Sequence, residues 1–183
     1  MAKAKTKQPN LLAGIDPDSL PEPPPPTDWY GFRDQVPAAT DPAKLAKAVS
    51  MLRSEKFQLY AEVHTDHVTG VVRSQREEEL VYSCVLIEGG IYACCTPDVE
   101  LCMGLRGEPC KHLLVLVIGL ARAGLLDVTT ADKWITAAAA NNHRWNKTTR
   151  NYVSDTLLKY KGVQAGEVDW RPTETIPEDF YTG

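Results

Sequence analysis

The sequence lacks a long hydrophobic run. Its longest apolar stretch, between His112 and Arg122, covers nine residues, whereas a membrane-spanning helix needs ~20. The opening Met-Ala-Lys-Ala-Lys-Thr-Lys-Gln is polar and has no apolar core of the kind that a signal peptide contains. We therefore expect a cytoplasmic protein with no membrane partner.

The sequence also lacks an excess of positive charge. Its 183 residues include 20 Lys and Arg against 24 Asp and Glu, which gives a net charge of −4. Most nucleic-acid-binding proteins carry a positive field, so any contact of that kind has to be local here. Hydrophobic residues make up 43% and charged residues 24%, the balance of a globular protein, and the length allows one domain with tails.

Both ends of the chain contain little that a core could bury. Residues 1–27 include five prolines at positions 21–26, which favour polyproline II, so we expect a flexible Pro-rich arm. Residues 166–183 carry five acidic side chains, one arginine and three aromatic residues. We expect this acidic aromatic-bearing tail to dock on a protein partner, because short aromatic anchors among charges are typical of segments that order on binding. The alternative is that its aromatic rings fold back onto the helices of this protein. The candidate docking residues are Trp170, Phe180 and Tyr181.

Between the tails, residues 28–165 show the hydrophobic periodicity of a folded domain. Asp41 and Pro42 are typical of a helix start, and an apolar stripe follows them as far as Leu52. From Phe57 the apolar period becomes that of strands. The sequence predicts a helix over 41–52 and strands over 59–63, 67–73, 79–88 and 91–94.

The C-terminal half of this domain is predicted to be helical. Gly89 and Gly90 predict a two-residue hairpin turn between the last two strands. The run that ends at Gly124 is apolar on nearly every face, which indicates a buried helix, and Thr129 is a helix cap with Asp132 in the first turn. The predicted helices span 110–124, 129–140 and 147–160. The expected fold is α+β: a small antiparallel β-sheet followed by a cysteine-rich loop and a helical C-terminal half, with disordered or extended tails.

A cluster of metal-binding residue types follows the predicted sheet. Four of the five cysteines fall within 17 residues, and a histidine comes two residues after the last. In a reducing compartment such clustering indicates a metal site more than disulfides. A structural zinc site needs four nitrogen or sulfur ligands in a tetrahedron. The five candidate ligands are Cys94, Cys95, Cys102, Cys110 and His112.

Five donors compete for four positions. Neighbouring residues of a strand point to opposite faces, so Cys94 and Cys95 are not expected to face the same ion. The even spacing selects one structural Zn²⁺ held by Cys94, Cys102, Cys110 and His112, and Cys95 stays an alternative to Cys94 or Cys102. Cys84 alternates with apolar residues on its strand and is expected in the core.

This cluster resembles the SWIM zinc finger, in which Cys-x-Cys is followed by a variable loop and by Cys-x-His at the start of an apolar helix. The matching fragments are Tyr92-Ala-Cys94 and Cys110-Lys-His112-Leu-Leu, and the resemblance covers roughly residues 80–122. It implies Cys94, Cys110 and His112 as ligands of a structural zinc. This sequence departs from the pattern because Cys95 follows Cys94 directly, which leaves the fourth ligand to the spacing argument.

The same resemblance implies a function in binding. SWIM domains contact proteins or nucleic acids, and the Cys102-Met-Gly-Leu-Arg-Gly107 run is similar to small bacterial SWIM components that accompany MoxR-type AAA ATPases and von Willebrand A proteins. Three thiolates and an imidazole close a zinc coordination shell, and no phosphate loop or nucleophile elbow is present. We therefore expect a non-catalytic zinc-binding adaptor with a protein partner of that kind.

An alternative function is nucleic-acid binding. The segment 143–152 interleaves cations, amides and aromatic rings, a combination that contacts phosphates and stacks on bases. The opposing interpretation is that its aromatic rings pack internally and its cations form a solvated face. The candidate nucleic-acid residues are Arg144, Trp145, Lys147, Arg150 and Tyr152.

Overall fold

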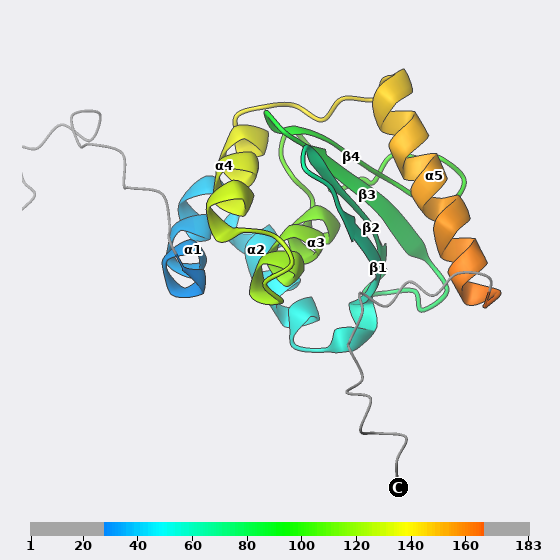
Figure 1. The fold of residues 1–183 in the computed structure, drawn as a ribbon, viewed down its shortest axis with the longest axis horizontal. Coiled ribbons are helices and arrows are strands. Elements are labelled where there is room, and N and C mark those ends of the chain that lie inside the picture. Colours follow the sequence, from blue (N-terminus) through cyan, green and yellow to red (C-terminus); the bar gives the residue numbers. More distant parts are fainter. Residues whose placement is uncertain (1–27, 167–183) are drawn as a thin grey trace, which may run out of the picture.

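A computed structural model describes residues 28–166 and places a four-stranded sheet between helices on both faces (Figure 1). The strands are β1 (Gln58–Val63), β2 (His67–Arg73), β3 (Val81–Ile87) and β4 (Ile91–Cys95). The α-helices are α1 (Trp29–Gln35), α2 (Pro42–Leu52), α3 (Lys111–Arg122), α4 (Val128–Ala139) and α5 (Lys147–Gln164). Short 3-10 turns, η2 (Val36–Ala39) and η3 (Glu55–Phe57), flank α2.

The sheet is an antiparallel meander in the order β1-β2-β3-β4. α3 packs against one face of it, α2 and α4 pack beside α3, and α1 lies against α4. α5 crosses the opposite face, where it contacts β2, β3 and β4 (Figure 1). The predicted α+β class, with an antiparallel sheet before a mainly helical half, is confirmed.

The start of α2 follows the sequence prediction. The Asp41 carboxylate accepts a hydrogen bond from the Lys44 backbone N–H at 2.7 Å, and Pro42 is the first helical residue. The start of α4 does not, because Asp127 lies earlier and its carboxylate accepts from the Thr130 backbone N–H at 2.9 Å. The predicted cap at Thr129 was wrong, and α4 begins at Val128.

Two helices differ most from the prediction. α1 was not expected; it begins at a cap in which the Asp28 carboxylate accepts from the Gly31 N–H at 2.8 Å. α5 runs to Gln164, beyond the predicted end at Tyr160. The extra turn extends an amphipathic helix whose apolar side lies on the sheet, where Tyr160 and Val163 pack near Tyr60.

The buried helix α3 explains the apolar stretch of the sequence. Its side chains fill the space between the sheet, α2 and α4. Gly70 on β2 permits the close approach, because a Cβ there would lie 2.5 Å from Leu116 Cδ1 and 2.7 Å from the Tyr60 carbonyl oxygen. Among residues 28–166, no helix combines the length and the apolar character needed to cross a membrane.

The hairpin between β3 and β4 carries the strands that build the site. Ile87 pairs with Ile91, so the loop has three residues, Glu88, Gly89 and Gly90, and not the predicted two. Both glycines have positive φ, +78° and +76°, as the sequence predicted. Gly90 also packs on α4, because a Cβ there would lie 2.3 Å from the Ala137 carbonyl carbon.

The two glycines form a matched pair for testing this contact. We expect Gly89→Ala to lower the free energy of unfolding by about 1 kcal/mol, because alanine is strained at positive φ and nothing lies within 4 Å of its Cβ. Gly90→Ala has the same strain and also collides with α4, so we expect a loss of about 2–4 kcal/mol. Urea unfolding measures both, and equal losses would contradict the packing of this turn on α4.

Candidate metal centre

Three separate parts of the chain bring four ligand-type side chains together. Cys94 lies on β4, Cys102 in the loop between β4 and α3, Cys110 at the N-cap of α3, and His112 in the first turn of α3. One ligand atom from each lies within 4.8 Å of the others, and all four residues are buried. The arrangement could hold one metal ion.

The loop reaches the cluster by folding back on β4. Its Thr96 backbone N–H donates to the Glu100 carbonyl oxygen at 2.9 Å, and Leu101 forms a bridge with Cys95. The Cys102 N–H then donates to the Cys94 carbonyl oxygen at 2.9 Å. Backbone hydrogen bonds therefore set Cys102 beside Cys94, although seven residues separate them in sequence.

The start of α3 supplies the other two donors. Cys110 has an extended backbone, with φ −80° and ψ 164°, and its side chain makes no capping hydrogen bond, so the thiol turns to the cluster. His112 follows two residues later with its ring against Tyr82, stacked at 3.9 Å between centroids and 15° between planes. The Tyr82 ring thus fixes the orientation of the imidazole.

Gly104 lets the loop backbone touch the cluster. A Cβ at this position would lie 3.0 Å from Cys110 Cβ and 3.4 Å from Cys102 Sγ. The Gly104 N–H also donates to Cys102 Sγ at 3.4 Å. Hydrogen bonds of this kind to a ligating sulfur orient it and stabilise its thiolate.

The thiols differ in their tendency to ionise. Hydrogen bonds from Cys110 and Cys94, and one from His112, hold the pKa of the Cys102 thiol far below its usual range. Burial raises the pKa of Cys94 and of Cys110 well above the usual range. Three neighbouring thiolates would repel one another in a buried site, so full ionisation requires a bound cation.

One pair of donors has the spacing expected on a tetrahedral ion. Cys102 Sγ and His112 Nδ1 lie 3.5 Å apart, and a thiolate and an imidazole nitrogen on one tetrahedral zinc are separated by ~3.6 Å. The other ring nitrogen, His112 Nε2, is buried and has no hydrogen-bond partner among the described residues. A set of three soft sulfur donors and one imidazole is suited to a borderline or soft metal ion.

Cys95 lies outside the cluster. It packs beneath α5 with Ala93 and Val153, on the opposite face of the sheet from Cys94. Burial raises the pKa of its thiol to about 12. The structure thus places Cys94 and Cys95 on opposite faces of the sheet, as the alternation of strand residues predicted.

Cys84 is a neighbour of the cluster that sequence reasoning missed. It is buried in the core as expected, but its Sγ lies 3.6 Å from Cys94 Sγ. Cys84 and Cys94 are directly paired across β3 and β4. Counting outward from the predicted two-residue glycine turn would have paired Cys84 with Cys95, and it is the three-residue loop that places Cys84 opposite Cys94.

The residues of segment 143–152, which the sequence offered as an alternative nucleic-acid-binding site, lie on the other side of the sheet from the metal cluster. Trp145 is partly buried against Cys95 and its neighbours, and Tyr152 packs on His67 with 4.3 Å between ring centroids. Both rings therefore have internal contacts, as the opposing interpretation expected, whereas Arg144, Lys147 and Arg150 are exposed.

The predicted docking residues Trp170, Phe180 and Tyr181, and the arm over residues 1–27, lie outside the described residues.

Comparisons of this chain with protein-family models, with curated proteins and with solved structures gave no match.

The first prediction for this site is that removing one ligand side chain releases the metal ion. We expect about one metal ion per chain, and Cys110→Ser should release it and lower the free energy of unfolding by about 3 kcal/mol or more, because metal binding is coupled to folding. Elemental analysis of the purified protein and thermal melts measure both quantities. A metal-free native protein, or an unchanged melting temperature in Cys110→Ser, would refute the site.

The second prediction separates the two adjacent cysteines. Cys94→Ala should abolish metal binding, whereas Cys95→Ala should keep a full metal content and lose only about 1 kcal/mol of stability, since it removes one small buried side chain. The two variants remove the same atoms from neighbouring residues of β4, so each is the control for the other. Metal loss in Cys95→Ala with retention in Cys94→Ala would reverse the facing of β4.

Proposed function

We propose that this protein is a non-catalytic, zinc-stabilised adaptor. The loop of residues 96–109, called the metal loop below, docks on a partner protein. Zinc is the ion that best suits three thiolates and an imidazole in a buried cluster of four donors. In this proposal the ion is held by Cys94, Cys102, Cys110 and His112, where it supplies positive charge that balances the thiolates. The function of the ion is to hold the metal loop against β4 and α3.

The donor set supports a structural ion. Catalytic zinc sites keep one coordination position open for water or substrate, whereas structural sites have four protein ligands. Here four buried protein donors surround one position, and the imidazole is covered by the Tyr82 ring. A substrate has no free coordination position in such a shell.

The observation that carries the docking proposal is the exposure of apolar side chains on the metal loop. Of the eight large hydrophobic side chains exposed among residues 28–166, three fall within five residues of this loop. Met103, next to the proposed ligand Cys102, is 84% exposed. Exposed apolar groups that gather in one place are typical of protein interaction sites. The three residues are Val99, Leu101 and Met103.

Strain at Val99 points to the same loop. Its φ is +66°, and it is the single non-glycine residue with positive φ among residues 28–166. A β-branched residue in this region is costly, by about 1–3 kcal/mol, and such strain tends to be kept where it serves function. The turn is held because the Val99 N–H donates to the Thr96 carbonyl oxygen at 3.0 Å and the Glu100 N–H to Thr96 Oγ1 at 3.3 Å.

The partner in this proposal is a protein with a hydrophobic groove flanked by basic side chains. The apolar loop would enter the groove, and the acidic tail with Trp170, Phe180 and Tyr181 would meet the basic flank. The SWIM resemblance suggests a MoxR-type AAA ATPase or a von Willebrand A protein as that partner. Co-purification with a tagged chain from its native host identifies it.

The docking loop is tested by charge substitution at its most exposed residue. We expect Met103→Glu to weaken capture of the co-purified partner about tenfold or more, because a central apolar anchor commonly contributes ~2 kcal/mol. Leu158→Glu is the control, because Leu158 is also largely exposed but lies on α5. Melting temperatures and zinc content should stay unchanged in both. Equal capture by the two variants would remove the metal loop from the proposal.

A further inference from the structure

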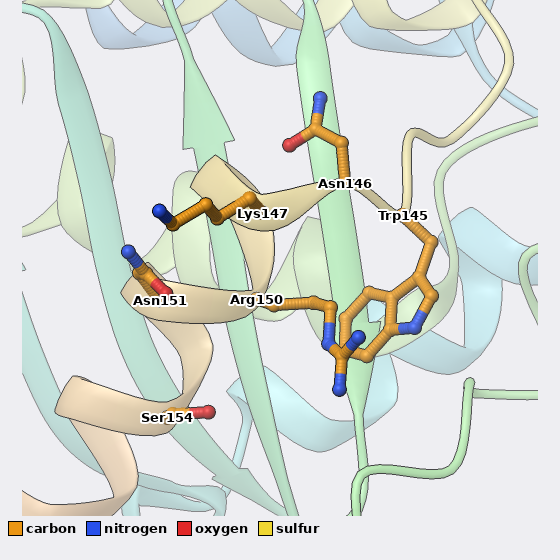
Figure 2. Close-up of a pocket in the computed structure, with 6 residues that line it drawn as sticks. All are labelled: Trp145, Asn146, Lys147, Arg150, Asn151 and Ser154. Carbon is orange, nitrogen blue, oxygen red and sulfur yellow. The ribbon is translucent and has the colours of Figure 1, made fainter.

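A surface pocket lies at the first turns of α5, on the face of the sheet opposite the metal cluster (Figure 2). Its volume is about 430 Å³, within the range of ~300–1,000 Å³ that small-ligand sites usually have. The lining combines an aromatic ring, two cations, two amides and a hydroxyl. These residues are Trp145, Asn146, Lys147, Arg150, Asn151 and Ser154.

The charge of this pocket is positive and not internally balanced. Neither Lys147 nor Arg150 takes part in any ion pair among residues 28–166. No acidic residue lines the pocket, and the whole segment 143–154 contains none. The domain as a whole is close to neutral, so this is a local site for an anion and not part of a general positive field.

The aromatic wall is held in place from behind. Trp145 is partly buried against the cluster of Val85, Ala93, Cys95 and Val153. The Arg150 guanidinium lies over the indole, 5.7 Å from the ring centroid, and Figure 2 shows this side chain reaching across to the ring. A guanidinium held over an indole places a positive charge beside an aromatic face, and a second planar group can stack on either of them.

The remaining lining groups add hydrogen bonds. The Asn146 side chain is used as the N-cap of α5, where it accepts from the Thr149 N–H at 3.0 Å. The Asn151 amide and the Ser154 hydroxyl lie one and two turns further along the helix on the pocket side, and both can donate and accept hydrogen bonds. They provide polar contacts beside the stacking surface.

We infer that this pocket binds a nucleotide unit, with its phosphate contacted by Lys147 and Arg150 and its base stacked on the Arg150–Trp145 pair. A phosphopeptide would use the cations but would leave the aromatic wall and the amides without a function. The same chemistry is present in a free nucleotide and in one residue of a single-stranded nucleic acid, in which bases are free to stack on aromatic side chains.

The experiment uses the zinc-loaded full chain and fluorescence anisotropy with a labelled single-stranded oligothymidylate of about 12 nucleotides. Thymidine monophosphate is the unlabelled competitor, so that the base is the same in both ligands. Displacement by the mononucleotide assigns the site to a free nucleotide, and binding of the strand without such displacement assigns it to single-stranded nucleic acid. With one phosphate neutralised, affinity for the strand should fall about threefold between about 50 mM and 200 mM salt.

Variants test the named residues. We expect Arg150→Ala and Trp145→Ala each to weaken binding about tenfold, since loss of a stacking side chain commonly costs ~1–3 kcal/mol per base. Lys161→Ala is the matched control, because it removes an exposed cation from the last turn of the same helix, and it should bind within about twofold of the wild type. Circular dichroism checks that each variant is folded; Arg150 is exposed, so its loss keeps the test valid if Trp145→Ala unfolds.

Three results would overturn the inference. The first is the absence of binding to both ligands at about 50 mM salt. The second is equal affinity of Arg150→Ala and Lys161→Ala. The third is preferential binding of a phosphoserine peptide with no effect of Trp145→Ala, which would make this a phosphate site that does not use the aromatic wall.

Discussion

The convergence of Cys94, Cys102, Cys110 and His112 is the constraint on which the metal loop depends. The segment between β4 and α3 buries little of its own, since most of its residues from Pro97 to Gly107 are exposed or half-exposed. Its position is determined by the backbone bonds to β4 and by the side chains that meet in the cluster. A cation bound there would balance buried thiolates whose mutual repulsion otherwise opposes the fold. Residues on one β-strand, one loop and one helix are thereby held as a unit.

Much of this arrangement could be predicted because it depends on local rules. The alternation of strand residues separates Cys94 from Cys95, the glycine turn places β3 beside β4, and the wholly apolar run of α3 requires a buried helix. Each rule acts within a few residues, so the sequence is enough to apply it. The four-stranded antiparallel sheet follows from those rules, whereas the grouping of the four ligands was predicted from the spacing of the cysteines and from the SWIM resemblance.

The parts that could not be predicted depend on distant or competing contacts. α1 is a short helix whose packing against α4 joins segments about a hundred residues apart. At α4 both Asp127 and Thr129 are plausible caps. Asp127 is the cap because its carboxylate accepts a hydrogen bond from the Thr130 N–H. The positive φ of Val99 opposes the intrinsic preference of valine, so only the surrounding hydrogen bonds of the loop explain it. Local pattern carries no signal for such features.

β4 connects the two surfaces to which we assign binding. Its Tyr92 and Cys94 belong to the core around α3, and its Ala93 and Cys95 belong to the core beneath α5 that also supports Trp145. One strand thus supports the metal cluster on one face and the aromatic wall of the pocket on the other. Because a shift of β4 by one residue would exchange these faces, a ligand at Cys94 also fixes Cys95 under α5. A metal ion bound by the four ligands would therefore contribute to the shape of a pocket that it does not touch.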